Sequence, residues 1–170
     1  MTPMDQRFYE TGLTTDQFIA QLGANREKFE QLLAECVLDD EQRRALADSP
    51  AYNVLVIAEP WSGDVLYNLP VLLCTAAATG WSVRIFRRDE HPELIMPYRK
   101  DGLYLSIPVF VFYDAEFNEV ANWIERPAVA TKTIDDESLA LRRRLREEHK
   151  AAWRQATLAE LLTLPRDLNA

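Results

Sequence analysis

Residues 53–64 read Asn-Val-Leu-Val-Ile-Ala-Glu-Pro-Trp-Ser-Gly-Asp and contain the most informative pattern in the chain. Five of the first six residues are apolar, three of them β-branched, without alternation, which is typical of a strand covered on both faces. A long apolar segment, residues 64–79, follows and stops at Gly80, which indicates a helix. The turn between them therefore places residues 62–65 near a helix N-terminus, where unpaired backbone N–H groups favour an anion.

Further segments predict the strands that complete a small sheet. In chain order, the expected strands are residues 53–58, 81–87, 107–113 and 119–124. The second strand alternates in polarity and follows the helix, so we expect it to be parallel to the first, with a right-handed crossover. A short connection separates the last two strands, which favours a hairpin. The fold class is therefore α/β, a sandwich of the order β-α-β then β-β-α around a mixed sheet of about four strands.

Apolar periodicity predicts the remaining helices. In chain order, the expected helices are residues 16–22, 26–37, 40–47, 64–79, 91–99, 135–153 and 158–162. Thr15 is the expected N-cap of the first helix, Asn25 that of the second, and Asp39 or Asp40 begins the third. The last helix is expected to stop before Pro165.

The length of 170 residues fits one core with terminal additions. We expect a helical extension over residues 1–50, the α/β domain over residues 51–155 and a helical tail over residues 156–170. The chain has 19 Lys and Arg against 27 Asp and Glu, a net charge of −8. This acidity argues against nucleic-acid binding, because phosphate contacts need a basic face.

The cysteine count and the apolar runs bound the remaining classes. Two cysteines exclude a disulfide scaffold and a four-cysteine zinc site. No secretory signal and no apolar run of about 20 residues is visible, so we expect no membrane span. Unpaired cysteines without an export signal favour a reducing cytoplasm. The acidic turn Asp89-Glu90-His91 and Glu93 predicts a solvated surface rather than a metal site, and no cofactor is predicted.

At these residues the chain resembles the thioredoxin family, and more closely a bacterial branch whose loop reads Glu-Pro-Trp-Cys-Gly-Asp. The resemblance covers roughly residues 51–155. Besides the loop, the matching segments are Pro70 in the helix, Arg88-Asp89-Glu90 after the second strand, Ser106-Ile107-Pro108 before the third strand, and Trp123 with Arg126-Pro127. The resemblance implies a thioredoxin fold and a cis peptide bond between Ile107 and Pro108.

The chain departs from the family at the residues that perform its chemistry. Ser62 occupies the position of the nucleophilic cysteine, and Val65 that of the second cysteine. Thiol–disulfide exchange requires sulfur on both partners, so dithiol oxidoreductase activity is not expected. Two explanations account for Ser62. It is either a natural serine or a cysteine replaced by serine, and in the second case the protein is a monothiol redox protein.

The other reactive side chains offer weak substitutes for the missing thiol. Cys74 lies in an apolar part of the same helix as Ser62, and Cys36 lies on the apolar stripe of an earlier helix, so we expect both to be buried and inert. A general-base role for His91 on Ser62 is conceivable, but a polar cap at the start of a helix is favoured. No catalytic residue is therefore assigned.

The resemblance leaves a binding groove as the functional hypothesis. Its candidate binding residues are Trp61, Ser62, Gly63, Asp64, Ser106, Ile107 and Pro108. With a cis bond before Pro108, the Ile107 backbone would turn outward and pair with an extended peptide by strand addition. We therefore expect a non-redox protein that binds a ligand, a peptide or a protein partner in this groove.

Two alternatives stay open. The Ser62 hydroxyl could donate a hydrogen bond to a small thiol such as glutathione, as some thioredoxin-fold transferases do, although we expect residues 132–170 to be too few for their helical second domain. The added helices, including Trp153 on the long helix, could instead pair two protomers. The oligomeric state is not predicted.

Overall fold

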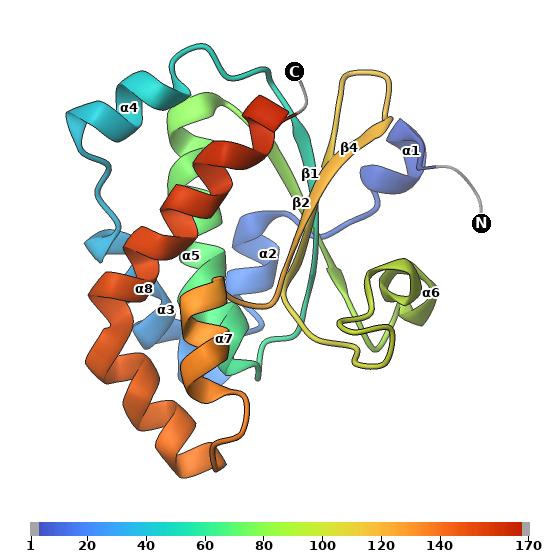
Figure 1. Cartoon of the computed structure of the whole chain (residues 1–170). Helices are drawn as coiled ribbons and strands as arrows, with labels where there is room; N and C mark the ends of the chain where they lie inside the picture. Colours follow the sequence, from blue (N-terminus) through green and yellow to red (C-terminus); the bar gives the residue numbers. More distant parts are fainter. Residues whose placement is uncertain (1–3, 168–170) are drawn as a thin grey trace.

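The computed structural model describes residues 4–167 and shows a four-stranded sheet with helices on both faces (Figure 1). The strands are β1 (Asn53–Ala58), β2 (Ser82–Arg87), β3 (Val109–Tyr113) and β4 (Glu119–Ile124). Their order in the sheet is β2-β1-β3-β4. The α/β sandwich with a mixed sheet of four strands is thereby confirmed.

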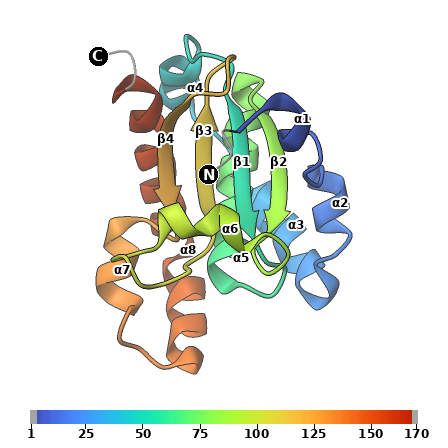
Figure 2. The same ribbon diagram turned by 90° about the vertical axis from the view of Figure 1, so that its right-hand side faces the viewer.

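The helices of the described chain vary from single turns to one long helix. They are α1 (Gln6–Tyr9), α2 (Thr15–Ile19), α3 (Arg26–Glu35), α4 (Asp40–Leu46), α5 (Gly63–Thr79), α6 (Pro92–Ile95), α7 (Ala128–Ile134) and α8 (Leu139–Asp167), with 3-10 turns η1 (Gly23–Asn25) and η2 (Met96–Tyr98). The helices α3, α5, α7 and α8 lie on one side of the sheet, and α1 and α6 lie on the other (Figures 1 and 2).

The strand directions follow from the connections. β1 pairs with β2 in parallel, with Val56 opposite Ile85, because α5 crosses over between them. β1 pairs with β3 in antiparallel fashion, with Ile57 opposite Val109, and β3 pairs with β4 through the expected hairpin. This register places the end of β1 beside the start of β3, and both lie next to the loop that enters α5.

A single apolar cluster joins the sheet to helices from both ends of the chain. It contains Phe18 and Phe29 from the N-terminal helices, Leu69 from α5, and Leu158 and Leu161 from α8, all fully or nearly fully buried. Burying large side chains of this kind stabilises the fold by about 1.5–3 kcal/mol each. The division of the chain at residues 50 and 155 remains a prediction.

The C-terminal helices differ from the prediction. Residues 139–167 form one helix, α8, where a long and a short helix were expected, and α7 was not predicted. Residues 154–157 (Arg-Gln-Ala-Thr) continue the helix because three of them are strong helix formers. Thr157 also donates its hydroxyl to the Trp153 carbonyl, which keeps it within the helix.

One of the expected N-caps was wrong, and a second lies at the expected position but makes no cap hydrogen bond. The N-cap of α2 is Thr14 instead of Thr15, and it forms a capping box with Gln17. Asn25 precedes α3, but its side chain donates to the Pro60 carbonyl at 3.0 Å and makes no cap hydrogen bond. The start of α4 is as expected, with Asp39 as the N-cap.

Neither a membrane-spanning helix nor a cluster of metal-ligating side chains is present among the described residues. Among them, no helix is both long and apolar enough to cross a membrane. Residues 4–167 also bring together no group of three or more His, Cys, Asp or Glu side chains suited to a metal ion.

Candidate functional site

Ser62 forms the N-cap of α5, as the sequence predicted for this turn. Its backbone is extended, and its hydroxyl oxygen accepts a hydrogen bond from the Val65 N–H at 3.3 Å. The residue is only 8% exposed. The hydroxyl oxygen thus satisfies one N–H group of the helix N-terminus, and the hydroxyl keeps its proton and one lone pair for another partner.

Trp61, directly before this cap, is the exposed aromatic residue of the loop, with 59% of its surface accessible. The Arg88 guanidinium lies over its ring at 5.1 Å from the centroid. Arg88 also donates from Nη1 to the Leu105 carbonyl at 3.1 Å. Arg88 therefore joins the Trp61 loop to the segment that precedes Ile107 and Pro108.

The Ile107–Pro108 peptide bond is cis. The side chains of Ile107 and Pro108 are buried, and the Pro108 carbonyl accepts a hydrogen bond from the Glu125 N–H at 2.7 Å. Within the described part of the chain, neither the N–H nor the C=O of Ile107 has a protein hydrogen-bond partner. Since Val109 pairs with Ile57, this unpaired backbone lies beside the loop that carries Trp61.

The segment between α6 and β3 exposes further apolar side chains. Met96 is 46% exposed, and Leu103, Tyr104 and Leu105 are 72%, 60% and 39% exposed. Figure 2 shows this segment and α6 at the same end of the sheet as the start of α5. Exposed apolar side chains gathered at one end of a molecule indicate an interaction surface.

Glu59 is a residue of the loop that sequence reasoning did not assign. Its side chain is fully buried, and it accepts from Arg87 Nη2 at 2.8 Å and from the Asp89 N–H at 2.9 Å. A buried carboxylate needs such partners, because an unpaired charge is costly in the interior. Glu59 therefore ties the end of β1 to the end of β2 and positions the Trp61 loop.

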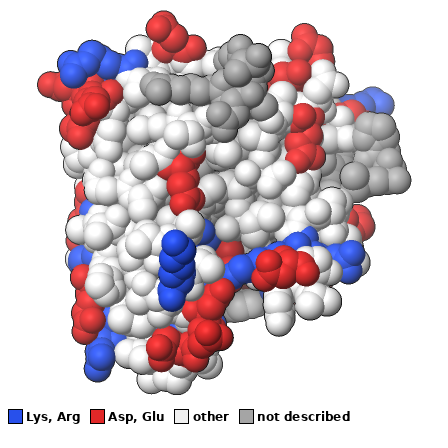
Figure 3. All heavy atoms as spheres, viewed as in Figure 1, with Lys and Arg blue, Asp and Glu red and all other residues white. Residues whose placement is uncertain are grey.

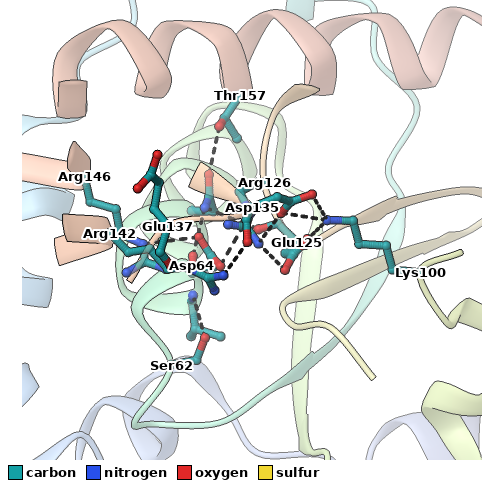
Figure 4. Close-up of polar contacts among 12 residues, drawn as sticks. Ser62, Asp64, Lys100, Glu125, Arg126, Asp135, Glu137, Arg142, Arg146 and Thr157 are labelled. Carbon is teal, nitrogen blue, oxygen red and sulfur yellow. Dashed lines mark hydrogen bonds and ion pairs between the residues drawn. The ribbon is translucent and has the colours of Figure 1, made fainter. Parts of the chain in front are cut away.

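Asp64, a predicted binding residue, lies near Ser62 and belongs to a largely buried ion-pair network (Figure 4). Its carboxylate is 3.3 Å from Arg146 Nε of α8 and 3.6 Å from Arg126 Nε after β4. Burial raises the pKa of Asp64, and the Arg146 and Arg126 guanidinium groups oppose that rise. The Asp64 carboxylate thus forms ion pairs with Arg146 and Arg126 within the protein.

The network continues from Arg126 to the segment after η2. Arg126 also pairs with Glu125 and with Asp135 at the end of α7, and Lys100 Nζ lies 2.6 Å from Glu125 and 3.1 Å from Asp135. The Arg126 side chain is only 4% exposed. These pairs fix the start of α5 against α7 and α8, and they were not predicted from the sequence.

Gly63 leaves the space that this arrangement needs. A Cβ atom at this position would lie 2.6 Å from Arg146 Nη1, which is closer than real contacts allow. The Arg146 guanidinium therefore approaches the first turn of α5, where its charge is balanced by Asp64. The structure thus gives Gly63 and Asp64 packing roles beneath the loop.

The two cysteines lie together, away from this loop. Cys74 Sγ donates to the Cys36 carbonyl at 2.9 Å, and both thiols are free. Burial, with a smaller contribution from Cys74, raises the pKa of Cys36 to about 12. A thiol that stays protonated at neutral pH is a poor nucleophile.

His91 packs its imidazole ring against aromatic side chains. Its ring centroid lies 5.3 Å from that of Phe86 and 6.2 Å from that of Phe8. Its Nδ1 lies 3.5 Å from Glu93. These contacts orient the histidine at the start of α6.

The basic residues of α8 are distributed among acidic ones. Lys150 and Arg154 pair with Glu35 of α3, and Arg144 pairs with Glu148. In the view of Figure 3, Lys and Arg groups alternate with Asp and Glu groups, and no continuous basic area is visible among the described residues. These pairs serve mainly to join α8 to α3.

Comparisons with known proteins agree with this geometry. A family model described as thioredoxin matches residues 12–140. A crystal structure of a protein of unknown function from Pseudomonas aeruginosa is similar, with a TM-score of 0.73 and 20% identity over 96% of this chain and 97% of that one. An HIV epitope-scaffold is also similar, with a TM-score of 0.69 and 19% identity over 93% of this chain and 94% of that one. No curated protein matches the sequence significantly. The chain belongs to the thioredoxin family.

Proposed function

We propose that this protein is a thioredoxin-family member that binds an extended peptide segment of a partner protein without thiol chemistry. The peptide would bind between Trp61 and Ser62 on one side and Ile107 and Pro108 on the other. The observation that carries the proposal is the unpaired Ile107 backbone, next to the segment that Arg88 links to the exposed Trp61 ring. With Ser62 and Val65 at the two cysteine positions, the groove can hold a partner but cannot form a mixed disulfide with it.

The exposed side chains favour a peptide over a small ligand. An extended peptide would use the Ile107 N–H and C=O for main-chain hydrogen bonds, as in strand addition. Its apolar side chains would then contact Trp61 on one side and Leu105 on the other. Arg88 would form the wall between them, because it contacts both residues.

A small thiol such as glutathione is the second candidate ligand, because some thioredoxin-fold transferases bind it through a serine hydroxyl and Ser62 retains a hydroxyl proton. The burial of Ser62 and its hydrogen bond with the Val65 N–H disfavour it. The pocket next to Trp61, of about 290 Å³, is lined by Pro60, Arg87 and residues of the N-terminal helices. Calorimetry with glutathione decides this point, and we expect no heat of binding at millimolar concentration.

The proposal is tested with a library of cysteine-free peptides displayed on phage and selected on the full chain. The tightest peptide is then titrated against the wild type and against Trp61→Ala by fluorescence anisotropy. If Trp61 is a central contact, its removal costs about 2 kcal/mol, or roughly 30-fold in affinity. Leu139→Ala is the matched control, because Leu139 is also exposed, at 74%, but lies at the start of α8.

The backbone part of the proposal has its own test. N-methylation of one peptide amide at a time removes a single donor and leaves the side chains in place. We expect one or two methylated positions to abolish binding, because they face the Ile107 carbonyl. A peptide that tolerates methylation at every position, or that binds the Trp61→Ala variant as tightly as the wild type, would show that the groove is not used.

The residue that the natural gene encodes at position 62 decides between this binding role and monothiol redox activity. A natural cysteine there would make the protein a monothiol redox member of the family, similar to the bacterial branch with the Glu-Pro-Trp-Cys-Gly-Asp loop. The free thiols of Cys36 and Cys74 fit a reducing compartment, so we expect the protein to act in the cytoplasm.

A further inference from the structure

The face of the sheet opposite α5 carries a large pocket that is separate from the Trp61 groove. Its volume is about 930 Å³. It is lined by residues of α1, of α6 and by Leu55 of β1. The helices α1 and α6 lie on this face of the sheet (Figure 2). Ligand pockets have volumes of about 300–1,000 Å³ and mainly apolar walls, so this pocket is large enough for a small organic molecule.

Four aromatic rings line this pocket. They come from four different elements: Phe8 of α1, Tyr98 of η2, Tyr113 of β3 and Phe117 of the β3–β4 hairpin. Tyr98 and Tyr113 are 9% and 7% exposed, so their rings are held firmly in the wall. The faces of aromatic rings attract cations, most strongly when the cation has lost part of its hydration.

Three carboxylates lie in the same lining: Asp5, Glu93 and Glu119. The Tyr98 hydroxyl donates to Glu119 Oε2 at 2.6 Å, which holds this carboxylate against the aromatic wall. Among the described residues that line the pocket there is no lysine, arginine or histidine to balance these charges. The pocket therefore combines apolar walls with a negative potential.

We propose that this pocket binds an amphipathic organic cation, a molecule with an apolar body and an ammonium group. The apolar body would lie against Leu55 and the aromatic rings, and the ammonium group would lie near Glu93 and Glu119. This charge complementarity excludes anions and disfavours neutral molecules of the same shape. The site is independent of the proposed peptide groove, because it uses none of its residues.

Three matched compounds test the proposal: 4-phenylbutylammonium, 4-phenyl-1-butanol and 4-phenylbutyrate. Each is titrated into the ¹⁵N-labelled full chain and followed by NMR and calorimetry. We expect the cation to bind at least about tenfold more tightly than the alcohol, because the two carboxylates attract the ammonium group at contact distance. The largest shifts should be those of the Tyr98, Tyr113 and Phe117 amides.

Paired variants separate the local carboxylates from the overall negative charge. Glu93→Gln with Glu119→Gln should reduce the preference for the cation to about threefold or less. Glu41→Gln with Asp48→Asn removes the same net charge from exposed residues in and just after α4, and it should leave the preference unchanged. Equal binding of the three compounds, no binding of the cation, shifts outside the pocket, or an equal loss in both double variants would overturn the proposal.

Discussion

Replacing Ser62 by cysteine puts a thiol at the helix start and measures the electrostatic environment that the loop retains. The Val65 N–H, 3.3 Å from the Ser62 oxygen, would then donate to a thiolate. A free cysteine has a pKa of about 8.5, and a helix N-terminus contributes roughly 0.3–2 kcal/mol in favour of a negative charge. At 1.36 kcal/mol per pKa unit, the helix N-terminus alone lowers the pKa by about 0.2–1.5 units, to between about 7 and 8.3, while the burial of position 62 acts in the opposite direction.

The assay is the pH dependence of alkylation by iodoacetamide. Cys36→Ala and Cys74→Ala are introduced first, so that the new thiol is the single cysteine of the chain. Ala51→Cys in the same background is the control, because Ala51 is exposed and lies outside any helix. Its pKa should be about 8.5. A pKa at position 62 equal to or above that of the control would refute the claim that this loop still favours an anion.

Three other predictions concern stability and reactivity. Glu59→Gln should lower the free energy of unfolding, measured in urea, by about 1.5–3 kcal/mol, because it removes the charge from a buried partner of Arg87. Glu90→Gln is the control, because Glu90 is an exposed partner of the same arginine. It should change the free energy of unfolding by less than about 0.5 kcal/mol. Hydrogen bonds from Lys28, Tyr67 and Lys150 lower the pKa of Glu147 to about 2, from an ordinary 4.5. The stability that these bonds provide is therefore present above about pH 4.5 and is lost as the pH falls towards 2. The thermal unfolding temperature of the Glu147→Gln variant should fall less over this pH range than that of the wild type. A thiol reagent at pH 7.5 should label Cys36 slowly in the native protein, because burial raises the pKa of its thiol, and Cys74 slowly, because its thiol is partly buried and donates to the Cys36 carbonyl. Both should be labelled rapidly in denaturant.

Each of these outcomes has a clear opposite. Equal destabilisation by the glutamine variants at positions 59 and 90 would show that burial of Glu59 does not matter. An unchanged acid transition in the Glu147→Gln variant would show that the Glu147 carboxylate does not stabilise the contact between α3 and α8. Rapid labelling of either cysteine in the native protein would make a thiol available for chemistry away from Ser62.

The local patterns predicted most of the fold because each depends on neighbouring residues. The bounds of β1 and β4 agree with the prediction, and the turn at Ser62 begins a helix as expected. The error over residues 154–157 has a physical cause. The apolar periodicity is interrupted there and so predicts the end of a helix, but Arg, Gln and Ala are strong helix formers and continue it.

The candidate site was predicted less completely, because its support comes from distant parts of the chain. Asp64 meets Arg146 across 82 positions of sequence, and no periodicity marks such a pair. The burial of Glu59 could have been predicted from its position in the sequence. A glutamate directly after a fully apolar strand is expected to be buried at the strand end, and burial requires a cationic partner.

The most direct measurement is the ¹⁵N resonance and hydrogen-exchange rate of the Ile107 amide while a selected cysteine-free peptide is titrated into the wild-type chain. If the partner adds as a strand beside the cis-proline, this amide shifts and its exchange slows in proportion to occupancy, with no covalent adduct by mass spectrometry. An Ile107 amide that neither shifts nor gains protection at saturation would contradict a peptide-binding role for this groove.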